Sequence, residues 1–159
     1  MPLQPADVEA AARIRDAERA RLDAAGIGGE LELVGGSSVT GALTHGDIDL
    51  HLRVPVAEFD ATVELMYDLY VDVKREIWQP TLAAFERIGM PPVGVAVTPL
   101  GSEHDERFSR SWTLLRAHPE LITEYNAMKR ADDGPDGPGY EARKSAFFDH
   151  LVAIDLDDP

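Results

Sequence analysis

LVGGSSVTG (residues 33–41), followed shortly by DIDL (residues 47–50), is the part of the chain that decides its fold. The first stretch carries a short apolar strand into a turn of small residues, whose glycines let backbone N–H groups approach a phosphate. The second stretch opens another strand, on which Asp47 and Asp49 project from the same face. This order predicts a site that holds a phosphate at one end and a divalent cation at the other.

The strand that begins at residue 47 is the clearest in the sequence, because polar and apolar residues alternate strictly up to residue 54. Its apolar face consists of Ile48, Leu50, Leu52 and Val54. Its polar face consists of Asp47, Asp49, His51 and Arg53. We therefore expect one face to pack on the core and the other to carry any chemistry.

The rest of the chain mixes helical and strand periodicity, which predicts an α+β fold in a single domain, residues 1–159. Helices are predicted over residues 6–25, 57–70 and 140–152, after Pro99, and from His118. Strands are predicted over residues 31–34 and 93–98 and, from a pattern that also fits a helix, over 81–87. Residues 132–139 are predicted to form a Gly/Pro/Asp linker, and residues 155–159 to fray.

Composition limits the classes of function. The chain has 159 residues and a formal net charge of -14, from 15 basic and 29 acidic side chains, which disfavours binding to nucleic acid. There is no cysteine, so disulfides and thiolate metal sites are excluded. With neither a signal peptide nor an apolar stretch of bilayer length, we expect a soluble, cytoplasmic protein that does not enter the membrane.

The spacing of the two aspartates suits a metal site. Residues two apart on a strand have Cα atoms roughly 6.5–7 Å apart, so the carboxylates of Asp47 and Asp49 can converge on one cation. Mg²⁺ is the expected ion, since it takes oxygen ligands and is usually bound by one or two carboxylates plus substrate phosphates. Gly36 and Ser37 are the expected phosphate ligands. Taken singly, each feature is also typical of a solvated sheet edge and an ordinary turn.

These residues resemble the signature of a large enzyme superfamily. Gly36-Ser37, Gly41 and Asp47-Ile48-Asp49 are similar to the motif of nucleotidyltransferases related to DNA polymerase β. The resemblance implies a nucleotidyltransferase-like mixed β-sheet flanked by α-helices. It also implies Mg²⁺-dependent transfer of a nucleoside monophosphate from a nucleoside triphosphate (NTP).

A closer resemblance, to the GrpB family (the UPF0157 group), covers most of the chain. Residues 35–41 are similar to the GSTSVPG motif of that family, and LRAHPE (115–120) and EYNAMKR (124–130) resemble two of its later blocks. Tyr140, Lys144 and Phe148 match its closing YxxxKxxF pattern. The resemblance implies the fold more firmly than an activity, because the biochemical role of the family is poorly defined.

Departures from these patterns concern the catalytic strand. The superfamily normally has a third carboxylate on a neighbouring strand, and GrpB-like proteins often have His-x-His there. The matching positions here are Gly94 and Ala96, which cannot bind a metal or accept a proton. Trp112-Thr113 also replaces the Arg-Asp of the family before LRAHPE, whereas Asp47 completes an Asp-x-Asp that many members lack.

Four further polar residues are site candidates with alternatives. Lys144 can bind a triphosphate or lie over aromatic rings, and Arg53 can bind phosphate or balance the two aspartates. His51 can act as a ligand or base, although a hydrogen-bonded structural histidine is favoured. Lys129 is predicted to be a solvated or ion-paired surface charge.

Two functions follow from these residues. The first is a Mg²⁺-dependent nucleotidyltransferase that acts on an unknown small-molecule or protein acceptor. Asp47 and Asp49 are its catalytic metal ligands, and Asp72 or Glu76 is the candidate third carboxylate. The second is a catalytically inactive module of the same fold that binds an NTP, another phosphorylated small molecule or a protein partner, as an antitoxin-like protein does.

Overall fold

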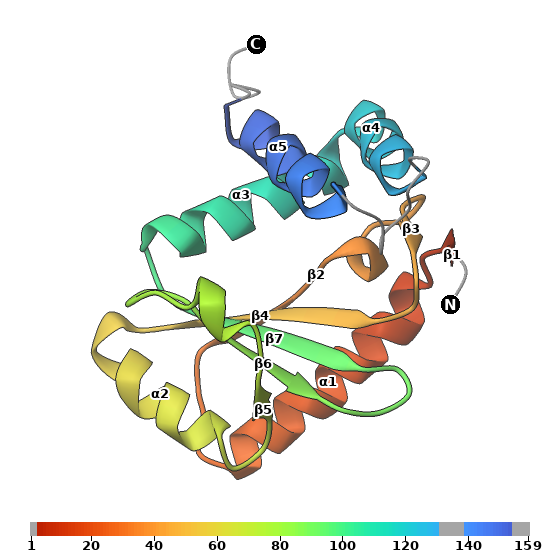
Figure 1. Cartoon of the computed structure of the whole chain (residues 1–159). Coiled ribbons are helices and arrows are strands. Elements are labelled where there is room, and N and C mark those ends of the chain that lie inside the picture. Colours follow the sequence, from red (N-terminus) through yellow and green to blue (C-terminus); the bar gives the residue numbers. More distant parts are fainter. Residues whose placement is uncertain (1–2, 131–138, 154–159) are drawn as a thin grey trace.

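A mixed sheet of five strands forms the centre of the computed structural model, which describes residues 3–130 and 139–153 (Figure 1). In spatial order the strands are β2 (Glu30–Val34), β4 (Ile48–Val54), β7 (Val93–Pro99), β6 (Ala83–Arg87) and β5 (Val71–Asp72). Only β4 and β7 run parallel, and the other neighbours are antiparallel. The strand of alternating residues therefore lies inside the sheet, between β2 and β7.

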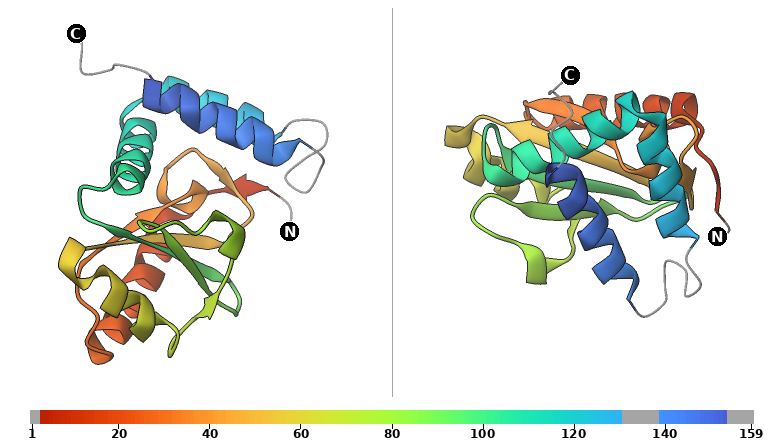
Figure 2. Two further views of the ribbon diagram at one scale, coloured as in Figure 1. Left: turned by 60° about the vertical axis from the view of Figure 1, so that its left-hand side comes forward. Right: turned by 90° about the horizontal axis from the view of Figure 1, so that it is seen from above.

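Helices cover both faces of this sheet. The helices are α1 (Val8–Ala24), α2 (Phe59–Met66), α3 (Glu103–Ala117), α4 (Pro119–Lys129) and α5 (Tyr140–Ala153). Three short 3₁₀ turns are η1 (Gly36–Ser38), η2 (Val56–Glu58) and η3 (Arg75–Ile77), and a small second sheet pairs β1 (Gln4–Pro5) with β3 (Leu43–Thr44). Figures 1 and 2 show α1 and α2 on one face and α3, α4 and α5 grouped over the other.

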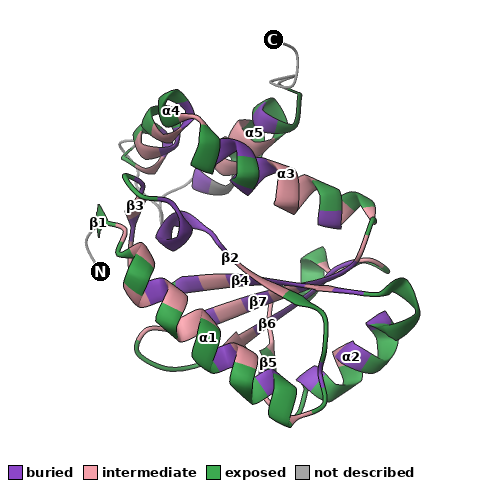
Figure 3. Cartoon of the chain, turned by 180° about the vertical axis from the view of Figure 1, so that it is seen from behind, coloured by how far each residue is buried: buried purple, intermediate pink, exposed green. Residues whose placement is uncertain are grey.

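Two hydrophobic clusters correspond to these two layers. The first lies between the sheet and α1 and α2, and includes Leu50 and Leu52 from the apolar face of β4. The second joins α3, α4 and α5 to the end of β2, through Trp112, Leu115 and Tyr125. Burial is highest along the central strands and the segment between β2 and β3 (Figure 3). The polar face of β4 therefore looks toward the three C-terminal helices.

The predicted α+β class and mixed sheet are confirmed, and residues 83–87 form a strand as expected. The helix predicted over 57–70 is shorter than expected. It ends at Met66, because the amides of Asp68 and Leu69 bond to the carbonyls of Leu65 and Met66, three residues back, in tight turns rather than continuing the helix. The predicted linker and frayed end lie almost entirely outside the described residues. No helix within the described part of the chain is long and apolar enough to cross a membrane.

Candidate functional site

A cleft of about 650 Å³ lies over the polar face of the sheet, between its central strands and helices α3 and α5. Asp49 lines it from β4, Asp47 lines it from just before that strand, and Lys144 lines it from α5. The volume is typical of a small-molecule site. The sequence-predicted metal ligands are thus brought together with one predicted phosphate ligand, Lys144, in a single cavity.

Backbone contacts hold the two aspartates in place. Asp49 pairs with Val34 on β2 and with Gly94 on β7, so the position of its Cα is fixed from both sides. Asp47 is exposed just before the strand, and its backbone carbonyl accepts a hydrogen bond of 2.7 Å from the Ser37 hydroxyl. The small-residue turn therefore positions the residue that begins the Asp-x-Asp motif.

Two glycines make room for the Asp49 carboxylate. Gly35 has φ +73°, and a Cβ atom there would overlap Asp49 Oδ2. At Gly94 a Cβ atom would lie 3.2 Å from Asp49 Oδ1. A side chain at either position would therefore crowd this carboxylate. The glycine of the turn and the glycine of β7 leave the space that the Asp49 side chain occupies.

Burial, together with the smaller effect of the nearby negative charge of Asp47, raises the pKa of Asp49 to about 6. Three lysines act in the opposite direction, in the order Lys144, Lys74 and Lys129. A buried carboxylate with a raised pKa, beside a second carboxylate and several cations, is typical of a functional site and is compatible with metal binding.

Lys129 is part of this environment rather than the surface charge that we predicted. It is half-buried, with its Nζ 5.5 Å from the Tyr125 ring and 5.7 Å from the Tyr140 ring. Burial lowers the pKa of Lys129, and the negative charges of Asp47 and Asp49 oppose this shift. Sequence periodicity did not reveal the burial of Lys129, because the residue lies beside the apolar stripe of α4. Tyr140 on α5 and Asp49 on β4 come near it only in the folded chain.

Gly36 and Ser37, predicted to hold phosphate, have structural contacts in this conformation. An added Cβ at Gly36 would lie 3.0 Å from both the Leu43 carbonyl oxygen and Tyr125 Oη, so this glycine packs closely against β3 and α4. The Ser37 side chain is buried and bonds to the Asp47 carbonyl, with Thr44 Oγ1 3.2 Å away. Gly35, not Gly36, lines the cleft.

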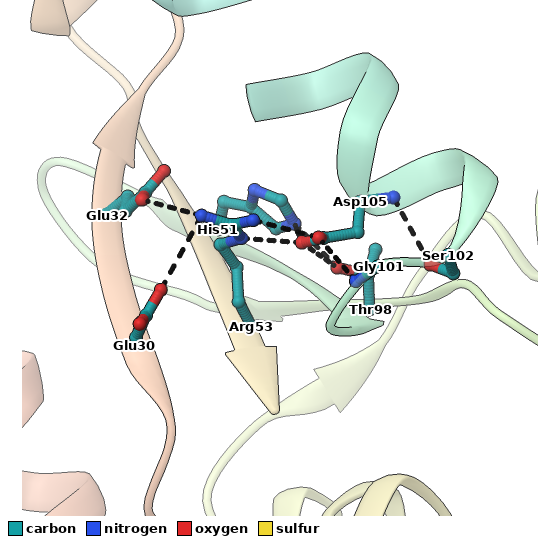
Figure 4. A network of polar contacts seen from close by, with 8 residues as sticks. All are labelled: Glu30, Glu32, His51, Arg53, Thr98, Gly101, Ser102 and Asp105. Carbon is teal, nitrogen blue, oxygen red and sulfur yellow. Dashed lines mark hydrogen bonds and ion pairs between the residues drawn. The ribbon is translucent and has the colours of Figure 1, made fainter. Parts of the chain in front are cut away.

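Arg53, also predicted to bind phosphate, belongs to a separate ion network (Figure 4). Its guanidinium donates to both carboxylate oxygens of Asp105, at 2.6 and 2.9 Å, and to Glu32 at 3.2 Å. Four residues of extended chain separate Arg53 from Asp49, roughly 13 Å. The structure therefore corrects the prediction: Arg53 ties β4 to α3 and β2, and it does not line the cleft.

His51 has the structural role that was favoured. Its Nε2 lies 2.7 Å from Thr98 Oγ1, and the ring is 1% exposed. Burial lowers its pKa to about 4, although Asp105 and Glu32 oppose that shift, so the imidazole is neutral near pH 7. Asp105 itself stays ionised: burial raises its pKa, but hydrogen bonds from Arg53 and Gly101 bring it below the ordinary value.

Neither carboxylate proposed as a third ligand comes near the pair. Asp72 lies on β5, three strands from β4, and pairs with Phe85, which belongs to the opposite, apolar face. Glu76 lies in η3. Among residues 3–130 and 139–153, no three His, Cys, Asp or Glu side chains are grouped closely enough to share a metal.

Sequence reasoning missed Glu86, which lines the same cleft. It pairs with Gly94, which pairs with Asp49, so all three residues share one face, with Glu86 two strands from the aspartates. Alternation within residues 83–87 gives its face only once the pairing of β6 with β7 is known. Glu86 therefore adds a negative charge to the far wall of the cleft.

The donor set fits a hard divalent cation. Two carboxylates supply oxygen ligands, which suits Mg²⁺, whose remaining positions are normally taken by water and phosphate oxygens. Lys144 and Lys129 lie within electrostatic range of Asp49 and are placed to attract an anionic ligand. The arrangement can accommodate a cation and a phosphate group side by side.

Comparison with known proteins gives consistent matches. The family model described as GrpB protein matches residues 3–153. A UPF0157 protein of Vibrio cholerae serotype O1 is 31% identical over 123 residues, which cover 77% of this chain but only 65% of that relative, slightly less than two thirds. The crystal structure of a conserved protein GrpB from Enterococcus faecalis has a TM-score of 0.74 at 18% identity, covering 94% of both chains, a likeness of fold.

Proposed function

The chain belongs to the GrpB family, and we propose that it binds a nucleoside triphosphate, or another phosphorylated small molecule, together with Mg²⁺ in the cleft above β4. Asp47 and Asp49 hold the cation in this proposal. The observation that carries it is the pair of carboxylates at a cleft of about 650 Å³ with three lysines within electrostatic range.

Each side chain then has a defined task. Asp47 and Asp49 supply the two protein oxygens for the cation, and Ser37 keeps Asp47 in register through its backbone carbonyl. Lys144 is the principal cation for the phosphates, because its charge has the largest stabilising effect on ionised Asp49. When bound, the metal neutralises charge on the phosphate oxygens.

Nucleotidyl transfer is the reaction that we propose for this site. The acceptor oxygen or nitrogen forms a bond to the α-phosphorus, the bond from that phosphorus to the β-phosphate oxygen breaks, and pyrophosphate leaves. Lys144 stabilises the charge of the leaving pyrophosphate. The acceptor proton passes to solvent water in this proposal, because no third carboxylate within the described residues is grouped with the pair to take it.

That gap favours a second candidate function, binding without turnover. Gly94 and Ala96 occupy the part of β7 that faces Asp49 and His51, and neither has a group that can move a proton. A regulatory module that binds a nucleotide, or a protein partner in an antitoxin-like role, needs only the cation, the phosphate contacts and the cleft.

Calorimetry tests the proposed binding, with ATP, GTP, CTP and UTP titrated in the presence and absence of Mg²⁺. We expect Mg²⁺-dependent binding that Asp49→Ala abolishes and that Asp16→Ala retains, since Asp16 is exposed on α1, outside the cleft lining. Failure of every nucleotide to bind, or full binding by Asp49→Ala, would refute the proposal. Release of pyrophosphate by the wild-type protein with an acceptor separates transfer from binding alone.

A further inference from the structure

Two buried polar atoms in the cleft wall have no hydrogen-bond partner among the described residues. They are Nδ1 of His51 on β4 and Oγ of Ser111 on α3. Both residues line the cleft, and they are only 1% and 2% exposed. Unpaired buried polar atoms are uncommon in native proteins, because desolvation without a partner costs free energy. A pair of them on one cavity points to a ligand that supplies the missing hydrogen bonds.

The hydrogen-bond chain on the other side of His51 defines what this ring offers. Asp105 is an ionised carboxylate that can only accept hydrogen bonds, and it accepts one of 3.2 Å from the Thr98 hydroxyl. The Thr98 oxygen must then accept from His51 Nε2, 2.7 Å away. Nε2 therefore carries the proton of the neutral imidazole, and Nδ1 presents a lone pair. Figure 4 shows this second ring nitrogen directed away from Thr98 and Asp105.

The surroundings of His51 suit a flat ring. On the same face of the sheet, His51 pairs with Ala96, and Ala96 pairs with Ala84, so two methyl groups form a low floor beside the imidazole. The Phe108 ring stands edge-on to His51 at 5.4 Å between centroids. Trp112 and Phe148, whose rings are 5.5 Å apart, continue the aromatic wall.

We propose that this inner part of the cleft binds the nucleobase of the nucleotide whose phosphates lie at Asp47 and Asp49. We call it the ring site, and its residues are His51, Ala84, Ala96, Phe108 and Ser111. An N–H of the base donates to His51 Nδ1, and the Ser111 hydroxyl bonds to a neighbouring polar atom of the same base edge. The inference rests on the proposed function and adds the part of the ligand that is not phosphate.

The layout of β4 supports one ligand that spans both parts. Asp49 and His51 lie two residues apart on the same face, so their Cα atoms are roughly 7 Å apart. Phosphates at Asp49 and a ring at His51 thus fit a compact molecule that carries both groups. Sequence motifs for metal or phosphate binding do not predict such a site, because its alanines and its buried serine belong to no such motif.

Paired ligands separate this inference from the proposed function. Calorimetry with Mg²⁺ compares inorganic tripolyphosphate, which has no ring, with the four nucleoside triphosphates. We expect at least one nucleotide to bind at least about tenfold more tightly than tripolyphosphate, because stacking of a base on protein aromatic rings contributes a gain of about this size in proteins that bind single-stranded nucleic acid. Equal affinities would overturn the ring site and leave the phosphate site intact, whereas binding of neither ligand would overturn the proposed function and the ring site with it.

Substitutions localise the effect. Ala96→Leu fills the floor and is expected to remove the nucleotide preference while tripolyphosphate still binds, which also shows that the variant is folded. Ser111→Ala is expected to weaken nucleotide binding about threefold to tenfold, the worth of one hydrogen bond. Ser109→Ala on the same helix, outside the cleft lining, is the matched control. Wild-type nucleotide affinity in Ala96→Leu or Ser111→Ala contradicts the assignment.

His51 can be observed without a mutation that risks unfolding the network around it. Long-range ¹⁵N–¹H correlation spectra report which imidazole nitrogen carries the proton. We expect a protonated Nε2 and an unprotonated Nδ1 whose resonance shifts when the tightest-binding nucleotide is added, but not with tripolyphosphate. Protonation at Nδ1 in the free protein, or an equal shift with both ligands, would overturn the inference.

Discussion

Replacing Asp49 by asparagine is expected to stabilise the metal-free protein and to abolish its response to Mg²⁺. The carboxylate lies at the floor of the cleft, beside Asp47, and burial together with that like charge raises its pKa to about 6. An ionised group in such a place lowers the free energy of unfolding until a cation binds. The neutral amide of Asn keeps the shape and removes the charge.

The magnitude follows from the pKa shift. A rise from 3.8 to about 6 corresponds to about 3 kcal/mol of lost stability when the group is fully ionised. Because the amide is itself polar and partly buried, we expect about 2 kcal/mol to be recovered, which raises Tm by about 4–8 °C. Mg²⁺ at 100 times its Kd stabilises only the wild-type protein, by about 2.7 kcal/mol, so the order of the two proteins reverses.

The pH dependence gives the sign. Native Asp49 has a higher pKa than the unfolded residue, so between about pH 4 and pH 6 the native protein holds the extra proton. Its destabilising effect is therefore absent below pH 4, grows through this window and is complete above pH 7. Urea unfolding of both proteins at pH 4 and pH 7.5 measures the difference. Equal stability at pH 7.5, or an undiminished gap at pH 4, would refute the reasoning.

Three other substitutions have expected outcomes. Arg53→Met leaves buried Asp105 without its bidentate partner, so we expect a loss of about 3–5 kcal/mol in urea unfolding; a loss below 1 kcal/mol would contradict a structural role. Glu86→Gln should leave the Mg²⁺ affinity measured by calorimetry within about twofold, because Glu86 lies two strands, roughly 10 Å, from Asp49; a tenfold loss would make it a metal ligand. Gly35→Ala forces φ +73° on a residue with a Cβ that meets Asp49 Oδ2, so we expect a fall in Tm and weaker Mg²⁺ binding, and wild-type values of both would contradict this packing.

The elements of the fold were largely predictable because period-2 and period-3.6 patterns are local. The alternation over residues 47–54 predicted the strand, which begins one residue later at Ile48, and its buried face, Leu50 and Leu52 included. The helix predicted over 57–70 was too long, because the chain tightens into turns after Met66 and the Tyr70 hydroxyl then donates to Glu18, a contact between residues far apart in the sequence. No periodicity carries that information.

The site was predictable only in part, for a related reason. Asp47 and Asp49 are two residues apart at the start of β4, so their position on one side of the sheet follows from the local geometry of an extended chain. Arg53 has the same face and the same period, yet its charge is taken up by Asp105 from α3. Strand register brings Glu86 to the cleft, and helix packing brings Lys129 within electrostatic range of Asp49; a single sequence specifies neither.

Gly94 and Ala96, the two small residues of β7 beside Asp49 and His51, connect the missing third ligand with the proposed ring site. A carboxylate at position 94 would have to share the space in which even a Cβ atom lies 3.2 Å from Asp49 Oδ1. Gly94 and Ala96 instead have little or no side chain above β7, so the cleft extends from the aspartates to His51 and the rings of Phe108, Trp112 and Phe148. The same two small residues that remove a possible base therefore create room for a larger ligand. If Gly94→Asp restored a three-carboxylate site, it would do so by narrowing this cleft, so we expect nucleotide affinity to fall relative to tripolyphosphate affinity. Calorimetry of both ligands measures that ratio, and an unchanged ratio would show that the space beside Gly94 does not serve the nucleotide.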